Sequence, residues 1–297
     1  MAKRLERRSA RVLAIVLALI MVGSIFAYIS PKGNIEQRDV KLEFLDFKET
    51  AAALNASFYE YLNFTYAYGL KTENEVYKLV ANASRSFDSK IFNQRVIQLP
   101  YGVREALLTY YEGYQTPIYA VNTNKSKIYF ASTTSEQFYN FSLRMNNREV
   151  ALVDEVEPLI IGYTPVVVLA MQKILAEPNK ELYSYLSRIN ETFGYAFFLF
   201  GSEAENALKS NETSYGDFYF EGYRFNETSS MYEKVVAIHF TENYFFVGMN
   251  ESEKNVTYYS YENYDDGLSI AIFADKDFKR VLDARPEIRG IIMHFEE

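Results

Sequence analysis

The apolar residues near the start of the chain form one long uninterrupted run. Residues Val12 to Pro31 are 20 consecutive residues without a charge, and those from Val12 to Val22 are apolar on every side of a helix. As a helix rising about 1.5 Å per residue, such a run covers about 30 Å, the thickness of the hydrocarbon core of a bilayer. The pattern predicts a transmembrane signal anchor over residues 12–31.

The charges beside this run predict its orientation. Residues 1–11 form a basic tail that carries Lys3, Arg4, Arg7, Arg8 and Arg11 against the single acid Glu6. Basic residues stay on the cytoplasmic side of a membrane, so a single-pass protein is expected with its N-terminus in the cytoplasm and the rest outside the cell. A cleaved signal peptide is the alternative. Its apolar region would be shorter, about 7–15 residues, and would end in small residues. Both interpretations export the remainder of the chain.

Beyond a short stalk at residues 32–42, the first periodic patterns are mainly helical. Val40–Phe47 alternates between apolar and polar residues and could form a first strand. Apolar stripes with the spacing of a helix then predict two amphipathic helices, at 49–68 and 73–88. A third is expected at Tyr101–Tyr114, after Pro100 and up to Gly113.

From Ile118 onward the period changes to two, which is typical of strands. Short strands are expected at Ile118–Val121, Lys127–Ala131 and Gln137–Met145, with a hairpin turn at residues 122–125. Apolar runs at Val150–Val153 and Thr164–Met171 predict two buried strands. The second run, Thr164–Met171, could instead begin a helix. A helix at Asn179–Phe193, a strand at Tyr195–Phe200 and a short helix at Ser202–Lys209 follow.

The last third of the chain predicts strands separated by turns. Four of them, Asp217–Phe225, Glu233–Phe240, Tyr244–Gly248 and Val256–Tyr261, indicate an antiparallel meander, and Leu268–Ala274, a helix over 275–284 and Ile288–Phe295 indicate a C-terminal β-α-β unit. Helices and strands are segregated more than alternated, so an extracytoplasmic α+β domain is expected over residues 43–297. A subdomain boundary could lie near residues 146–149.

Acceptor tripeptides for N-glycosylation, Asn-x-Ser/Thr, are unusually frequent. Half of the 20 asparagines begin one, whereas chance placement of the 35 Ser and Thr residues would produce about two or three. All lie beyond the apolar run, and their positions relative to the helical stripes and the apolar runs allow all of them to face solvent. The expected glycosylation sites are Asn55, Asn63, Asn82, Asn124, Asn140, Asn190, Asn211, Asn226, Asn250 and Asn255.

The amino-acid composition excludes several kinds of partner and site and indicates the source of the protein. The chain contains 31 basic and 39 acidic residues, and setting aside residues 1–11 leaves 26 basic and 38 acidic residues, a net charge of −12 that disfavours nucleic acid as a partner. There is no Cys, which excludes disulfides, thiolate zinc sites and cysteine nucleophiles. Many glycan acceptors without disulfides favour an archaeal cell-surface protein, because exported eukaryotic domains usually carry disulfides.

Three acids offer the main candidate for chemistry. Asp154, Glu155 and Glu157 lie between two apolar runs and could bind a divalent cation or supply a general acid and base. Such residues more often form the solvated link between two buried strands. In a second acidic pair, Asp275 is expected to cap the following helix and Asp277 to complement its dipole, and neither is expected to bind a metal.

Neither histidine completes a recognisable catalytic motif. Ser202 follows Gly201 at a strand-to-helix turn, with His239 and His294 later in the chain, but the Gly-x-Ser-x-Gly motif of α/β-hydrolases is absent. Both imidazoles are therefore expected to be structural. No phosphate-binding, dinucleotide-binding or EF-hand motif is present, so no cofactor is expected.

These observations predict a membrane-anchored, N-glycosylated surface protein that binds a partner as an accessory or assembly subunit. The alternatives are an exported carboxylate- or metal-dependent hydrolase and a tethered solute receptor with a cleft lined by some of the 26 Tyr and 23 Phe. Glycans exclude close contact between proteins, so a protein partner is expected on the acceptor-free segments 83–123, 143–189 or 258–297. The lipid bilayer, contacted through residues 12–31, is the other expected partner.

Overall fold

The computed structural model describes residues 43–55, 65–71, 76, 79, 96–100, 103–147, 149–189, 192–210, 213–249 and 256–290. The predicted anchor and stalk lie outside these residues, as do the predicted helix at 73–88, apart from positions 76 and 79, and His294. No helix in the described part of the chain is long and apolar enough to cross a membrane.

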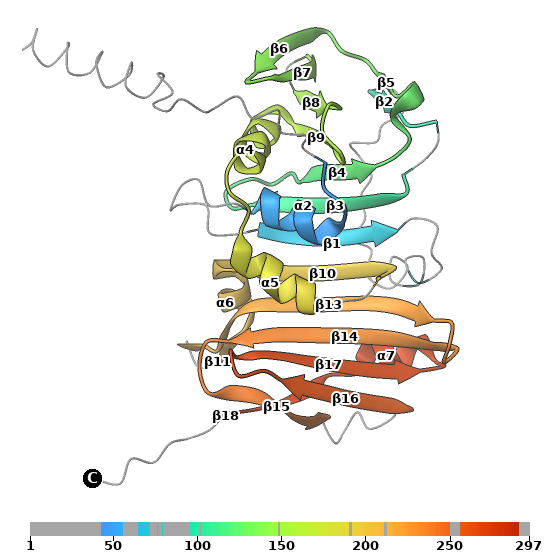
Figure 1. Ribbon diagram of the computed structural model, residues 1–297, viewed down its shortest axis with the longest axis vertical. Helices are drawn as coiled ribbons and strands as arrows, with labels where there is room; N and C mark the ends of the chain where they lie inside the picture. Colours follow the sequence, from blue (N-terminus) through green and yellow to red (C-terminus); the bar gives the residue numbers. More distant parts are fainter. Residues whose placement is uncertain are drawn as a thin grey trace, which may run out of the picture. The chain divides into compact units, whose positions relative to one another are not determined.

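Within the described residues, the chain forms an α+β fold built on one antiparallel sheet of 12 strands (Figure 1). In spatial order the strands are β16 (Tyr258–Asn263), β17 (Leu268–Asp275), β14 (Met231–Phe240), β13 (Gly216–Asn226), β10 (Tyr195–Phe200), β1 (Thr65–Lys71), β3 (Glu105–Tyr111), β4 (Ile118–Asn122), β9 (Leu159–Tyr163), β8 (Val150–Val153), β7 (Phe141–Asn146) and β6 (Thr134–Phe138). Three two-stranded ribbons accompany it: β2 (Ile97–Gln98) with β5 (Tyr129–Phe130), β11 (Lys209–Ser210) with β12 (Thr213–Ser214), and β15 (Tyr244–Met249) with β18 (Pro286–Gly290).

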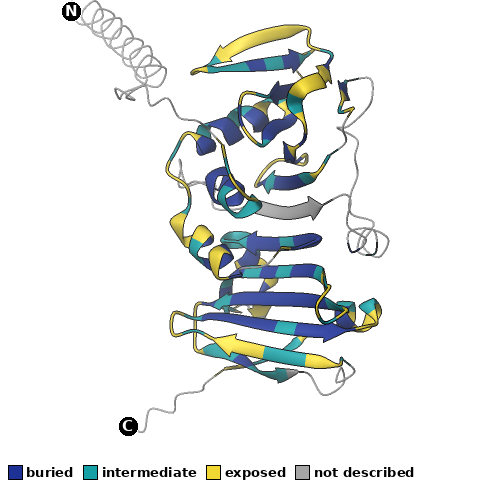
Figure 2. Ribbon diagram, turned by 45° about the vertical axis from the view of Figure 1, so that its right-hand side comes forward, coloured by how far each residue is buried: buried dark blue, intermediate teal, exposed yellow. Residues whose placement is uncertain are grey.

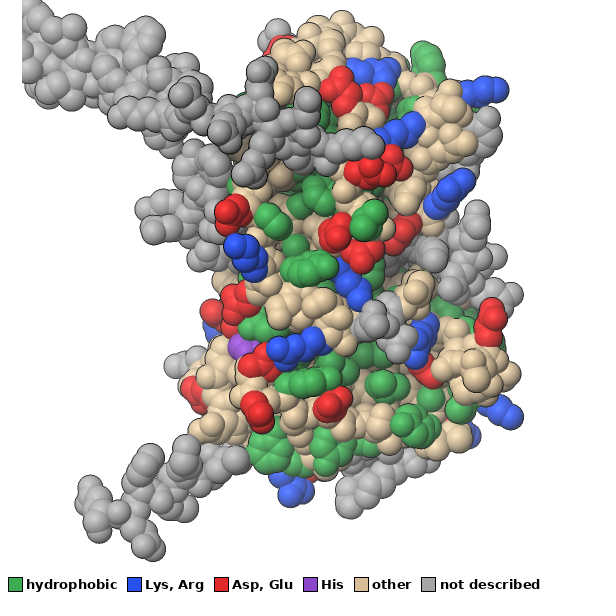
Figure 3. Space-filling model, in the orientation of Figure 1, with side chains coloured by type: hydrophobic (Ala, Val, Ile, Leu, Met, Phe, Trp, Pro, Cys, Tyr) green, Lys and Arg blue, Asp and Glu red, His purple; other side chains and the backbone are tan. Residues whose placement is uncertain are grey.

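Helices α2 (Phe47–Leu54), α4 (Thr164–Ile174) and α5 (Lys180–Arg188) pack against one face of the sheet and form a continuous apolar core with it. Leu54, Val167 and Leu186 are completely buried there. The opposite face carries α7 (Phe278–Asp283), the β15–β18 ribbon and α6 (Ser202–Ala207). The sheet is thus covered on both faces over much of its width. Figure 2 shows inner strands such as β14 and β17 as mostly buried and the outer strands β6 and β16 as mostly exposed. On the face seen in Figure 3, acidic and basic side chains lie among hydrophobic ones.

Short polar side chains cap helices α2, α5 and α7 (Phe278–Asp283). Asp46 caps α2 by accepting hydrogen bonds from the backbone N–H groups of Lys48 and Glu49, and Asn179 caps α5 in the same way through Leu182. At α7 the cap is Asp277, and Asp275 instead ends β17 and accepts hydrogen bonds from Thr257 and from the backbone of Asp277. The prediction that Asp275 caps this helix is therefore wrong by two residues.

Several predicted elements near the N-terminus are wrong. The expected helix at 49–68 ends at Leu54, and residues 65–71 form strand β1. The expected helix at Tyr101–Tyr114 is strand β3, whose Leu107, Leu108 and Thr109 are all buried because both faces of the sheet are covered there. Val40–Phe47 is not a strand over its described residues, since Glu43 makes one isolated bridge and Phe47 begins α2.

Turns and proline account for further differences. The expected strand Gln137–Met145 is split into β6 and β7 at Tyr139, whose φ of 51° forms the turn. For Thr164–Met171 the helical alternative is correct, because the segment belongs to α4, where Pro165 suits the first helical turn and would interrupt a central strand. Residues 122–125 do not close a hairpin, because β5 pairs with β2 and not with β4.

The C-terminal third agrees best with the sequence patterns, although its connections differ. Strands β13 and β14 pair as neighbours, but β15 leaves the sheet and β17 inserts between β14 and β16. Strand β18 pairs antiparallel with β15, so the chain does not form the expected β-α-β unit with β17. Asn146 and Val150, on either side of the expected boundary, are partners in the paired strands β7 and β8.

Candidate functional site

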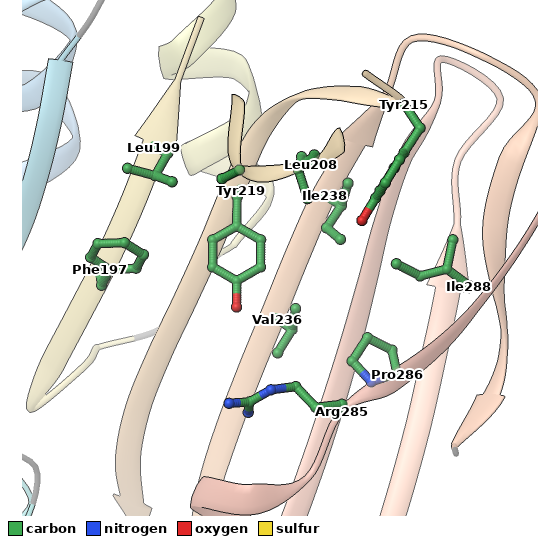
Figure 4. Close-up of a pocket in the computed structure, with 11 residues that line it drawn as sticks. Phe197, Leu199, Leu208, Tyr215, Tyr219, Val236, Ile238, Arg285, Pro286 and Ile288 are labelled. Atoms are coloured by element: carbon green, nitrogen blue, oxygen red, sulfur yellow. The ribbon is translucent and has the colours of Figure 1, made fainter. Parts of the chain in front are cut away.

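A cavity of about 390 Å³ lies over β10, β13 and β14, on the face of the sheet opposite α5 (Figure 4). Its walls are mostly apolar, and the segment after α7 closes one side. The apolar lining side chains are those of Phe197, Leu199, Ala207, Leu208, Val236, Ile238, Pro286 and Ile288. Tyr215, Tyr219 and Arg285 add polar groups. We call this space the Arg285 cavity.

Strand alternation brings these residues together. Along β13, Phe218 and Phe220 point into the core beneath the helices, so Tyr219, Glu221 and Tyr223 point to the opposite face. The next strand, β14, places Lys234, Val236 and Ile238 on that same face by the same alternation. The cavity is therefore built from the odd-numbered positions of β13 and the even-numbered positions of β14.

A charged network lies beside the cavity. The Glu221 carboxylate accepts a hydrogen bond of 2.5 Å from the Tyr219 hydroxyl and another from the Tyr223 hydroxyl, and it lies 3.5 Å from the Lys234 ammonium. Burial alone would raise the pKa of Glu221, but Lys234, the two hydroxyls and Arg285 outweigh burial and hold this pKa below its usual value. Glu221 is thus a fixed negative charge at neutral pH.

Lys234 and Arg285 share the same two backbone acceptors. The fully buried Lys234 Nζ donates to the carbonyl oxygens of Leu282 and Ala284 at 3.1 and 3.0 Å. The exposed Arg285 donates through Nη1 to the same two oxygens, at 3.0 Å each. Each carbonyl has two lone pairs, so one pair of carbonyls holds two cations. This arrangement ties the segment after α7 to β14 and directs Arg285 toward the cavity.

The comparisons with known proteins identify relatives of the chain. An uncharacterised protein of Archaeoglobus fulgidus is 41% identical over 294 residues, which cover 97% of this chain and 95% of that protein. Residues 43–175 match the AF_2048_N family N-terminal domain. The chain belongs to this archaeal family. No solved structure matches it.

Family membership agrees with the archaeal source expected from composition. The matched N-terminal domain ends one residue after α4, whereas every residue that lines the Arg285 cavity lies between Phe197 and Ile288. The Arg285 cavity therefore lies in the part of the chain that follows the matched N-terminal domain.

The structure gives each of the three candidate acids a different partner. Asp154 forms an ion pair of 2.6 Å with Arg144, Glu155 accepts a hydrogen bond from the backbone N–H of Ser142, and Glu157 lies 3.6 Å from Lys125. Among the described residues, no three His, Asp or Glu side chains are arranged to hold a metal ion. Asp154, Glu155 and Glu157 thus occupy the link between β8 and β9 without forming a common site.

The His239 imidazole makes hydrogen bonds within the fold, in agreement with the structural role expected from the sequence. Its two ring nitrogens make hydrogen bonds with the Asp217 carboxylate and with the Asp266 carbonyl oxygen. Ser202 lies apart from it as the first residue of α6, after Gly201. A polar cavity of about 600 Å³ lies nearby, where the turn after β14 meets the turn before β17. Its charged lining residues are Glu242, Asp265 and Asp266, all acidic, so it lacks the combination of apolar walls and a cation found in the Arg285 cavity.

Four glycan acceptors are described. Asn124 and Asn140 are exposed at turns and Asn226 is half-buried. Asn55 is only 4% exposed, so the expectation that all the acceptors face solvent is wrong there. The cause is that α2 ends at Leu54 and Asn55 terminates it inside the core, beside the buried Tyr111–Leu54 hydrogen bond. Asn63, Asn82, Asn190, Asn211, Asn250 and Asn255 lie outside the described residues.

Sequence reasoning did not find the Arg285 cavity. Glu221, Lys234 and Arg285 are separated along the chain and match no motif. One signal was present, since Glu221 and Lys234 are charged residues inside strands that are rich in aromatic and apolar residues. A charged residue at an inward position of a buried strand is rare unless it is paired, so it indicates a buried ion pair or a site.

Proposed function

We propose that this chain is a membrane-anchored, N-glycosylated protein of the archaeal cell surface whose sheet domain binds a small ligand in the Arg285 cavity. The observation that carries the proposal is an apolar cavity with one fixed cation at its edge. A volume of about 390 Å³ lies within the range of small-molecule sites, roughly 300–1,000 Å³. Such sites combine mainly apolar walls with a few oriented polar groups.

The location of the domain outside the cell is supported by the sequence alone. The apolar run at residues 12–31, the basic residues before it and the excess of glycan acceptors after it are consistent with an anchor and an outward domain. Binding is favoured over hydrolysis because the charged groups at the cavity are held in fixed ion pairs and hydrogen bonds. The candidate acids Asp154, Glu155 and Glu157 lie elsewhere and have separate partners.

An accessory-subunit role is the second candidate. The edge strand β16 lies in the acceptor-free segment 258–297, and its Tyr258 and Tyr261 side chains are 52% and 45% exposed. Exposed edge strands and tyrosines are common at protein interfaces. Mild solubilisation of the native membrane followed by mass spectrometry tests this role. A partner crosslinked to β16 would support it, and a chain that purifies alone would contradict it.

Ligand binding is tested with the full chain in lipid nanodiscs. Saturation-transfer NMR with the water-soluble neutral probe 3-phenylpropanamide measures occupancy of an apolar site, with empty nanodiscs as the blank. Ala207→Trp fills the mouth of the cavity from an exposed position, and Asn206→Trp, also exposed but not part of the lining, is the matched control. We expect saturation transfer for wild type and Asn206→Trp and its loss in Ala207→Trp. Equal signals in all three would contradict the proposal.

A further inference from the structure

The charges around the Arg285 cavity indicate the chemical class of its ligand. We propose that the cavity binds a small monocarboxylate with an apolar body, and that the carboxylate pairs with Arg285. This inference rests on the proposed binding function and makes it specific.

The first argument is the local charge. Lys234 and Arg285 each carry a positive charge and converge on the same two carbonyl oxygens, and Glu221 is the carboxylate that lies beside Lys234 among the described residues. Glu221 lies 3.5 Å from Lys234 and also accepts two tyrosine hydroxyls. Within the described part of the chain, no carboxylate lies within 4.0 Å of Arg285. Among these residues the charge of Arg285 therefore has no counter-ion at close range, and a ligand with a single negative charge would supply one.

The second argument is the orientation of Arg285. Its Nη1 is held by the Leu282 and Ala284 carbonyls, and its other nitrogens, Nε and Nη2, make no hydrogen bond to another described residue. Figure 4 shows the guanidinium extending along the cavity below the Tyr219 ring. A guanidinium fixed through one nitrogen can still offer a pair of N–H groups, and this fork matches the two oxygens of a carboxylate.

The third argument concerns the rest of the ligand. Among the lining residues, all of which the structure describes, Arg285 is the one with a positive charge. The Tyr219 hydroxyl proton is already donated to Glu221. Beyond Arg285 the walls are aliphatic and aromatic, including Leu199, Val236 and Ile238, so the remainder of the ligand gains free energy by burial of carbon atoms. A highly charged ligand would lack further cations there and would also meet an acidic chain, since residues 12–297 carry a net charge of −12.

The test compares two probes that differ in charge and have the same ring and chain length. Titration of the full chain in nanodiscs with 3-phenylpropionate and with neutral 3-phenylpropanamide gives a Kd for each. In wild type we expect the carboxylate to bind about tenfold more tightly or better. Arg285→Gln should reduce carboxylate affinity to about that of the amide, and the amide should still bind, which shows that the cavity is intact. Arg289→Gln, another exposed arginine of the same segment, is the control and should change neither Kd.

The outcomes separate the two proposals. Equal affinity for the two probes in wild type, or carboxylate binding that survives Arg285→Gln, would overturn the monocarboxylate assignment while leaving a cavity that binds apolar ligands. Failure of both probes to bind at a site sensitive to Ala207→Trp would overturn the binding function itself. A carboxylate preference that is lost in Arg285→Gln and kept in Arg289→Gln would support both.

Discussion

Nδ1 of His239 lies 2.6 Å from Oδ1 of Asp217, and Nε2 of the same ring lies 2.9 Å from the carbonyl oxygen of Asp266. Both ring nitrogens face acceptors, so the doubly protonated imidazolium satisfies both. The Tyr185 ring stacks on the imidazole with 4.6 Å between the ring centroids. The charged histidine therefore links β13, β14, α5 and the turn before β17.

This link makes part of the stability depend on pH. Burial lowers the pKa of His239, but the hydrogen bond and charge of Asp217, the Asp266 carbonyl and the charge of Glu181 outweigh burial and raise it. A raised pKa in the folded state adds stability that is fully present below the unfolded value of about 6.5 and is lost as pH rises through the folded value. We expect His239→Gln to lower the free energy of unfolding by about 1 kcal/mol more at pH 5.5 than at pH 8.5. Urea denaturation at the two pH values measures this, and an equal effect at both would contradict it.

Lys173 has the opposite dependence. It is fully buried in α4 with its Nζ 5.5 Å from the centroid of the Tyr111 ring, and burial lowers its pKa from 10.5 to about 8. Between these values the unfolded chain binds a proton that the folded chain does not, so stability rises with pH. We expect the free energy of unfolding of wild type relative to Lys173→Met to increase by up to about 3 kcal/mol across this window. Denaturation curves at pH 7.5 and 10 check it, and a constant difference would show that Lys173 keeps an ordinary pKa.

Glu221→Gln should destabilise the domain. The substitution removes the carboxylate that faces the fully buried Lys234, and breaking a buried ion pair by removing one partner costs about 3 kcal/mol or more. The midpoint of denaturant unfolding measures the loss. Glu205→Gln, at an exposed position of α6, is the matched control and should change the midpoint little. Similar midpoints for the two variants would mean that Glu221 does not stabilise Lys234.

Two strand glycines should respond differently to alanine. A Cβ at Gly222 would lie 2.6 Å from two ring carbons of Phe193 and 2.7 Å from Phe220, whereas a Cβ at Gly248 would approach nothing closer than 3.9 Å. Overpacking of a core costs about 1–3 kcal/mol, so Gly222→Ala should lower the melting temperature clearly and Gly248→Ala only slightly. Differential scanning calorimetry of both variants tests this ranking, and the reverse order would contradict the packing around Phe193.

The asparagines of the acceptor tripeptides should differ in whether they carry a glycan. A folded domain presents Asn124 and Asn140 at exposed turns, but it buries Asn55. We expect glycopeptide mass spectrometry of protein from its native membrane to find glycans at Asn124 and Asn140 and an unmodified Asn55. Unmodified asparagine at both exposed sites would contradict the export of the domain, and a glycan on Asn55 would contradict the end of α2.

The sequence patterns predicted strands best in the last part of the chain, where short apolar or alternating runs are separated by turns. Strand β10 was expected at Tyr195–Phe200 and is found there, and β13, β14 and β17 differ from expectation by two residues or fewer at each end. The patterns predict a helix over the start of β1 and over β3. In β3 a short run whose residues are buried on both faces of the sheet has no clear period. For Thr164–Met171, Pro165 favours the helical alternative that α4 confirms, since proline is rare inside central strands.

Less of the candidate site was predictable. Arg285, Glu221 and Lys234 meet only because β14 lies beside β13 and because the segment after α7 crosses back over that face. The pairing of β13 with β14 belongs to the expected meander, but the return of the segment after α7, 50 residues beyond Lys234 at Ala284, is a long-range contact that local patterns do not encode. Conversely, Asp154, Glu155 and Glu157 are neighbours in sequence, but in the structure each has its own partner.

The position of β1 sets an order for folding. This strand, at residues 65–71, pairs on one side with β3 and on the other with β10, at residues 195–200. The centre of the sheet therefore cannot close until more than a hundred further residues have been synthesised, and contacts of such long sequence separation slow folding. Until then β1 has an unpaired edge, which is prone to aggregation. If the chain is exported as proposed, the sheet closes only on the outer side of the membrane, after β10 has crossed.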